Sequence, residues 1–200
     1  MRIPIFISLL FVGLSFPVLA QHWTQTDNET IWRGRYKNCD KGYSVSLPSG
    51  VIAHGSHAPS PNHGILFSAS APETTTEVTL ETERVVGVYD SYDVAEYGNP
   101  QAYLKQILDR EGPVEVLASQ DTKFHGFPAA YVRFRRTEGD TKVETEEIVA
   151  YRRSKNIEPI FYVIWMRSPT QYFEQDLRLY EEIRDGFHLL PAPKGQCSND

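Results

Sequence analysis

The chain has 200 residues, of which 40% are hydrophobic and 23% are charged, and its formal net charge is −6. This length and composition suit one globular domain with a substantial core, and they exclude a disordered or fibrous chain. The acidic balance and the absence of a concentrated basic cluster argue against a nucleic-acid-binding protein, because phosphate binding depends on gathered Lys and Arg.

An apolar leader opens the chain. Arg2 precedes an apolar run, and Val18-Leu19-Ala20 offers small residues before a cleavage point. The pattern predicts a secretory signal peptide over residues 1–20, cut before Gln21, and therefore a periplasmic or secreted protein. A retained membrane anchor is the alternative, since the run is about long enough to span a bilayer. No later run resembles a membrane span, so none is expected after cleavage.

The two ends of the mature chain are polar and irregular. We expect residues 21–38 to be poorly structured, residues 39–190 to form a single α+β domain, and residues 191–200 to be a C-terminal tail. The only cysteines are Cys39 and Cys197. In an oxidising compartment they are candidates for a disulfide that ties the two ends together, although spacing alone does not decide between a pair and two free thiols.

The first half of the domain reads as strands followed by a helix. Residues 43–47 alternate apolar and small polar side chains and end at a turn, residues 53–64 form a loop, and strands are expected over 65–70 and within 77–92. Asn99 is a candidate helix cap with Pro100 behind it, and Gly112-Pro113 ends that helix.

The second half reads as an antiparallel meander. Strands are expected over 114–124, 128–137 and 141–153, joined by tight turns. The apolar run 160–166 suits a strand buried on both faces. Ser168 and Pro169 are expected to begin a terminal helix, which Gly186 would end in a left-handed conformation. The fold class is therefore α+β, with helices packed on an antiparallel β-sheet.

Four stretches resemble PsbP-like domains. They are the strand and turn 42–50, the helix after Asn99-Pro100, the turn 126–129 before a long hairpin, and the closing strand with the helix that ends at 183–187. The resemblance spans about Gly42 to Leu189 and implies an α/β/α sandwich and a non-enzymatic extrinsic subunit or adaptor. The loop after Gly50 departs from the photosynthetic members, so the likeness is to a bacterial exported member.

The loop 53–64 carries the first candidate site. It holds His54, His57 and His63, and neutral imidazoles are common ligands of zinc or copper. The spacing matches no helical metal motif, so a surface loop whose histidines are solvated is the alternative.

A second candidate is a run of tyrosines and carboxylates near a strand end. Tyr89, Tyr92 and Tyr97 could line a groove for a sugar or peptide, or they could pack in the core. Two charged pairs on expected strands, Arg133 with Arg135 and Glu144 with Glu146, are interpreted as solvated sheet faces.

No established catalytic motif or nucleotide-binding glycine pattern occurs in the sequence. We therefore expect a non-catalytic binding or accessory module that needs no cofactor and binds a protein or small-molecule partner. The alternative is a metal-binding protein or metal-dependent enzyme that uses His54, His57 and His63 with zinc or copper.

Overall fold

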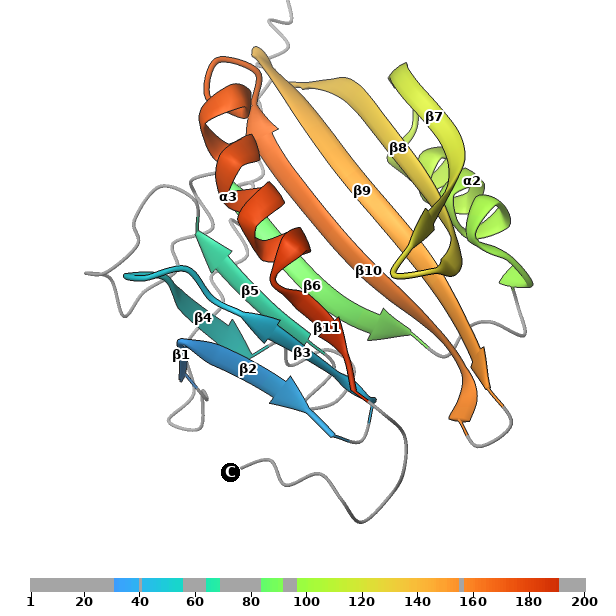
Figure 1. Cartoon of the computed structure of the whole chain (residues 1–200). Helices are drawn as coiled ribbons and strands as arrows, with labels where there is room; N and C mark the ends of the chain where they lie inside the picture. The colour runs from blue at the N-terminus through green and yellow to red at the C-terminus, as the bar shows by residue number, and fades with distance from the viewer. Residues whose placement is uncertain are drawn as a thin grey trace, which may run out of the picture.

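The computed structural model describes residues 31–39, 41–55, 64–68, 84–91, 97–154 and 157–190 (Figure 1). Its elements in chain order are β1 (Ile31–Arg33), β2 (Arg35–Asn38), β3 (Tyr43–Ser46), β4 (Ile52–Gly55), β5 (Gly64–Ser68), β6 (Val85–Ser91), α2 (Pro100–Glu111), β7 (Glu115–Phe124), β8 (Phe127–Glu138), β9 (Thr141–Ser154), β10 (Ile157–Pro169), α3 (Phe173–Asp185) and β11 (Phe187–Leu189).

The strands form two antiparallel sheets. The large sheet has eight strands in the order β1-β4-β5-β6-β10-β9-β8-β7, and the small sheet has the order β11-β3-β2. Helix α2 covers one face of the large sheet, while α3 and the small sheet cover part of the other face (Figure 1). The predicted α+β class with an antiparallel sheet is confirmed.

Strand β10 lies at the centre of the large sheet, between β6 and β9. Its alternate side chains enter two different cores, as expected for a strand buried on both faces. Tyr162 and Ile164 pack under α3 and the small sheet, whereas Phe161 and Val163 pack under α2. The apolar run that the sequence places at the heart of the domain therefore holds both layers to the sheet.

Helix α2 begins as its sequence predicts. The Asn99 side chain accepts a hydrogen bond from the backbone N–H of Ala102 at 2.9 Å, and Pro100 occupies the first turn. This cap satisfies one of the backbone donors that a helix start leaves without a partner. The helix ends at Gly112, whose φ of 78° suits glycine.

Helix α3 begins later than expected. Ser168 lies at the end of β10 and does not cap the helix; its hydroxyl donates to the Asp176 carboxylate at 2.6 Å. Arg84 donates to the same carboxylate from its Nε at 2.8 Å. Asp176 is buried in the first turn of α3, so this charged cluster fixes the start of the helix on the sheet.

Gly186 ends α3 for a different reason from the one predicted. Its φ is −75°, which is not left-handed. A Cβ at this position would lie 2.5 Å from the carbonyl oxygen of Ser46 on β3. Glycine is therefore required because the helix end approaches the small sheet closely, and not because of a positive φ.

The expectation that residues 21–38 are poorly structured is wrong for residues 31–38, which form β1 and β2. Strand β2 alternates exposed Arg35, buried Tyr36, half-buried Lys37 and buried Asn38 against β3. Strands of three and four residues are too short to leave a clear period in the sequence. Residues 21–30 lie outside the described part of the chain.

Three further predictions fall on residues that the structure does not describe. These are the leader over 1–20, the tail over 191–200 with Cys197, and the part of the expected strand before Arg84. Cys39 directly follows β2. Because Cys197 is not described, the proposed Cys39–Cys197 disulfide remains a prediction. Within the described ranges, no helix combines the length and the apolar character needed to cross a bilayer.

Candidate functional site

The three histidines proposed as metal ligands are placed only in part. The loop expected over 53–64 is wrong for residues 53–55, which belong to β4, and His54 on that strand is buried and not solvated. His57 and His63 lie outside the described residues. Across the described ranges, no three His, Cys, Asp or Glu side chains gather closely enough to hold a metal ion. A zinc or copper site at His54, His57 and His63 therefore remains a prediction.

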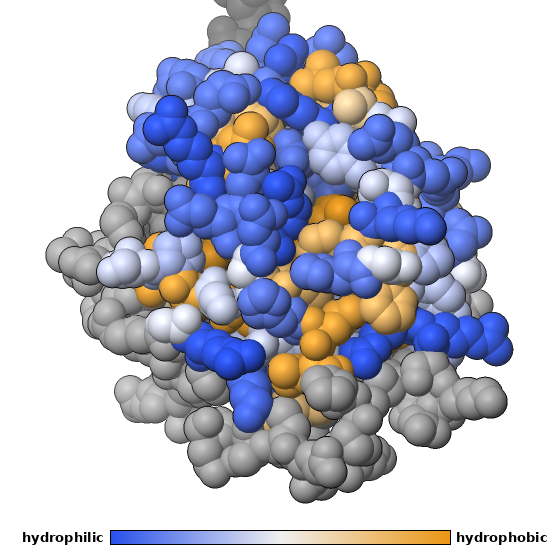
Figure 2. Space-filling model, in the orientation of Figure 1, coloured by the Kyte–Doolittle hydropathy of each residue, from blue (hydrophilic) through white to orange (hydrophobic). Residues whose placement is uncertain are grey.

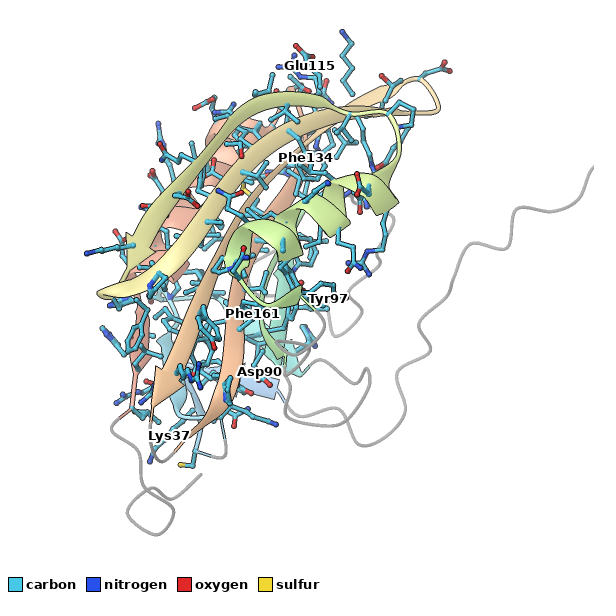
Figure 3. The ribbon with its side chains drawn as sticks, turned by 90° about the vertical axis from the view of Figure 1, so that its right-hand side faces the viewer. Lys37, Asp90, Tyr97, Glu115, Phe134 and Phe161 are labelled. Atoms are coloured by element: carbon cyan, nitrogen blue, oxygen red, sulfur yellow. The ribbon has the colours of Figure 1, made fainter. Side chains whose placement is uncertain are left out.

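Two of the three candidate tyrosines, Tyr89 and Tyr97, both contact Tyr103, which was not among the predicted site residues. The Tyr89 hydroxyl lies 2.8 Å from the hydroxyl of Tyr103 on α2. The Tyr97 ring meets the Tyr103 ring edge-on, with 4.9 Å between the centroids. Figure 3 shows Tyr97 just before α2, and the Tyr103 ring lies 5.1 Å from the ring of Phe161 on β10, between centroids. Tyr92 lies outside the described residues.

Burial keeps the hydroxyls of Tyr89 and Tyr103 protonated. It raises the pKa of Tyr103 to about 12 and that of Tyr89 well above its ordinary value. Each ring is at least partly buried and belongs to, or packs against, the apolar cluster under α2. The sequence pattern predicts Tyr103 as part of the apolar stripe of α2. A helical pattern does not predict that the Tyr103 hydroxyl forms a hydrogen bond with the Tyr89 hydroxyl.

A buried carboxyl, Glu147 on β9, lies on the same side of the sheet. Burial raises its pKa to about 8, and the positive charge of Arg110 on α2 only partly offsets this. Its Oε1 has no hydrogen-bond partner within the described part of the chain. Site prediction missed Glu147, yet the alternation of β9 carries the signal, because Glu147 shares its face with the inward residues Val143 and Val149.

The opposite face of β9 carries a second buried carboxylate, Glu144. Arg133 Nη2 lies 2.8 Å from Glu144 Oε2, and Arg135 Nη2 lies 2.7 Å from Glu144 Oε1. Burial opposes the charge on Glu144, but hydrogen bonds from Arg135 and Arg133 outweigh it and lower the pKa of the carboxyl. The interpretation of Glu144 and Glu146 as a solvated face is wrong, since both are buried.

Arg133 also joins the sheet to α3, and Arg135 joins β8 to β7. The Arg133 guanidinium lies over the Phe173 ring at 4.1 Å from the centroid, and it reaches Glu174 at 3.4 Å. Arg135 reaches Glu115 on β7 at 3.2 Å. The charged ladder across β7, β8 and β9 is therefore satisfied internally, and its chemistry is structural.

Strand β7 is the most exposed long strand in the described part of the chain. None of its ten residues is buried, and within the described ranges it pairs with β8 alone. Val116 and Leu117 are 49% and 37% exposed, and a bulge in the pairing with β8 falls between Val116 and Ala118. Figure 2 shows patches of hydrophobic residues among hydrophilic ones on the face that carries α3.

The outer edge of β7 and the side chains of Val116 and Leu117 form what we call the β7 edge. A sheet edge presents backbone N–H and C=O groups that can pair with another extended chain. Exposed apolar side chains next to such an edge add area that a partner can bury. The β7 edge combines both features.

Comparisons with known proteins define the fold. No protein-family model matches the sequence, and no curated protein is similar enough in sequence to count as a match. The solution structure of cyanobacterial PsbP (CyanoP) from Synechocystis sp. PCC 6803 superposes with a TM-score of 0.51 at 16% identity, covering 87% of this chain and 99% of that one.

Two other solved structures superpose less well. The Ran-binding protein Mog1p of Saccharomyces cerevisiae gives a TM-score of 0.47 at 10% identity, covering 80% of this chain and 97% of that one. LpqN of Mycobacterium tuberculosis, involved in cell envelope biogenesis, gives 0.46 at 11% identity, covering 84% and 88%. At these identities the likeness to CyanoP establishes the fold alone. The chain has a PsbP-like α+β fold.

Proposed function

We propose that this chain is an exported, non-catalytic binding module of the PsbP-like family, and that it binds an extended segment of a protein partner along the β7 edge. The observation that carries the proposal is the exposure of β7, which has no buried residue and presents Val116 and Leu117 to solvent. An added strand would pair with the outer backbone groups of β7 and cover both side chains.

Further observations support the proposal. The sequence begins with a leader that predicts export, and it contains no established catalytic motif. The fold likeness to CyanoP supports membership of the PsbP-like family. Natural edge strands are usually blunted by charges, prolines or bulges. The bulge of β7 is one such device, but Val116 and Leu117 beside it stay exposed, and this apolar surface supports use of the edge.

Site-specific photo-crosslinking in the source cell tests this function. A photoreactive residue at Leu117 is compared with one at Lys105, which is exposed on α2. We expect a discrete protein adduct from position 117 and none from position 105. Excess wild-type protein should compete the adduct away, whereas excess Val116→Lys/Leu117→Lys protein should not. Equal competition by the variant would remove the β7 edge from the binding surface.

Export is tested on the same material. The N-terminal residue of the protein recovered from the envelope or medium should be Gln21. A mature protein that still begins at Met1 would contradict the cleaved leader and favour the retained anchor.

A further inference from the structure

The turn between β7 and β8 packs against β11, the short strand that follows α3. His125 and Gly126 form this turn, with φ values of 49° and 83°. Among the described residues, His125 is the only residue other than glycine with a positive φ. Phe124 pairs with Phe127, so this is a two-residue hairpin turn, which favours positive φ at both positions, and His tolerates such a φ better than most residues.

Aromatic contacts hold the turn in place. The Phe124 ring lies 5.5 Å from the ring of Phe187 on β11, and the His125 ring lies 5.9 Å from it, between centroids. Residues 124 and 187 are far apart in the sequence, so the turn fixes the β7–β8 hairpin to the small sheet. The turn consequently presents the His125 imidazole beside β11.

A second imidazole lies next to it. The ring centroids of His125 and His188 are 6.5 Å apart at an interplanar angle of 62°, and both side chains are exposed. A metal bound at about 2.0–2.1 Å from an imidazole nitrogen lies roughly 3.2 Å from the ring centroid. Two rings on one tetrahedral ion are then roughly 5 Å apart. Rotation of two exposed side chains can close the remaining gap.

An imidazole binds metal in its neutral form. Burial, followed by the neighbouring His188, lowers the pKa of His125, while Asp185 at the end of α3 partly opposes this. The nearby carboxylate of Asp185 also supplies a negative charge that attracts a cation.

We propose that His125 and His188 form a two-histidine site for a divalent first-row transition metal. The ion would join the tip of the β7–β8 hairpin to β11, with water in its remaining positions. Water is needed because the described residues contain no group of three metal-ligating side chains. The site uses none of His54, His57 and His63, and it does not depend on the binding function of the β7 edge.

Calorimetric titration of Ni²⁺ into the metal-free full chain tests this site. Nickel binds imidazole sites more tightly than zinc does, and Mg²⁺, which prefers oxygen ligands, serves as the control ion. We expect one Ni²⁺ per chain and no Mg²⁺ binding. The His125→Asn/His188→Gln double variant should bind Ni²⁺ at least tenfold more weakly. Asn is chosen because it tolerates positive φ at position 125.

A His57→Ala/His63→Ala variant is the matched control and should bind Ni²⁺ as the wild type does. Retained affinity in His125→Asn/His188→Gln would overturn the proposal, as would loss of Ni²⁺ binding in the control variant. Circular dichroism melting of each variant separates loss of the ligands from loss of the fold.

Discussion

Replacing Glu147 by Gln should stabilise the protein at neutral pH. Glu147 is a buried carboxyl beneath α2 whose Oε1 has no partner in the described structure. Tyr89 and Tyr103 lie within electrostatic reach of it, and Arg110 is the cation that opposes its rise in pKa. An uncompensated buried charge is expensive, so the folded chain keeps this carboxyl protonated.

The size of this stabilisation follows from the difference between the pKa values of Glu147 in the folded and unfolded states. Burial raises the pKa of Glu147 from its ordinary value of 4.5 to about 8. Between these values the folded state holds a proton that the unfolded state has released. The free energy of unfolding therefore falls by about 1.4 kcal/mol per pH unit as the pH rises. By pH 7 the accumulated loss is roughly 3 kcal/mol.

The Glu147→Gln side chain is neutral at every pH and removes this dependence. We expect the variant to be more stable than wild type by up to about 3 kcal/mol at pH 7, with the difference vanishing near pH 4.5. Urea unfolding at intervals from pH 4.5 to pH 8 measures it. Glu182→Gln, an exposed change on α3, should run parallel to wild type. A Glu147→Gln curve that also runs parallel to wild type would refute the reasoning.

Three further predictions concern packing and covalent structure. Glu144→Gln should lower the free energy of unfolding by about 2 kcal/mol at pH 7, because Arg133 and Arg135 lose their charge-assisted hydrogen bonds to a shared carboxylate. The deficit should shrink as pH falls below 4.5, since the pKa of Glu144 is lowered in the folded state. Gly186→Ala should cost about 1–3 kcal/mol, because its Cβ would collide with the backbone of β3. Thiol titration of the denatured, unreduced protein should find neither Cys39 nor Cys197 free.

Each of these has a contrary outcome. A Glu144→Gln deficit that persists unchanged at pH 3 would mean that the carboxylate charge does not carry the stabilisation. A Gly186→Ala variant as stable as wild type would show that the helix end can move away from Ser46. Two reactive thiols per denatured chain would exclude the Cys39–Cys197 disulfide.

Much of the architecture can be predicted from the sequence, because the local sequence patterns there favour the same structure as the tertiary contacts. The apolar run of β10 needs burial on both faces, and its central position supplies it. Asn99 caps α2 as its residue type predicts. The meander from β7 to β10 follows from tight turns between long strands, which fix antiparallel neighbours.

The remainder depends on contacts between segments distant in the sequence. The burial of Glu144 is explained only by the two arginines that reach it from β8. Gly186 is explained by the approach of Ser46, which lies far away along the chain. The exposure of β7 could not be read from its residues, since Val116 and Leu117 are apolar and would ordinarily be assigned to a core.

Hydrogen exchange of β7 tests the central claim most directly. In the free protein, the outward-facing backbone amides of Glu115–Phe124 should exchange quickly, because no described strand pairs with the outer edge. In the complex with the protein crosslinked from position 117, those amides should become protected while the amides of α2 stay unchanged. Protection confined to α2, or β7 amides that exchange equally fast in the complex, would contradict binding at the β7 edge.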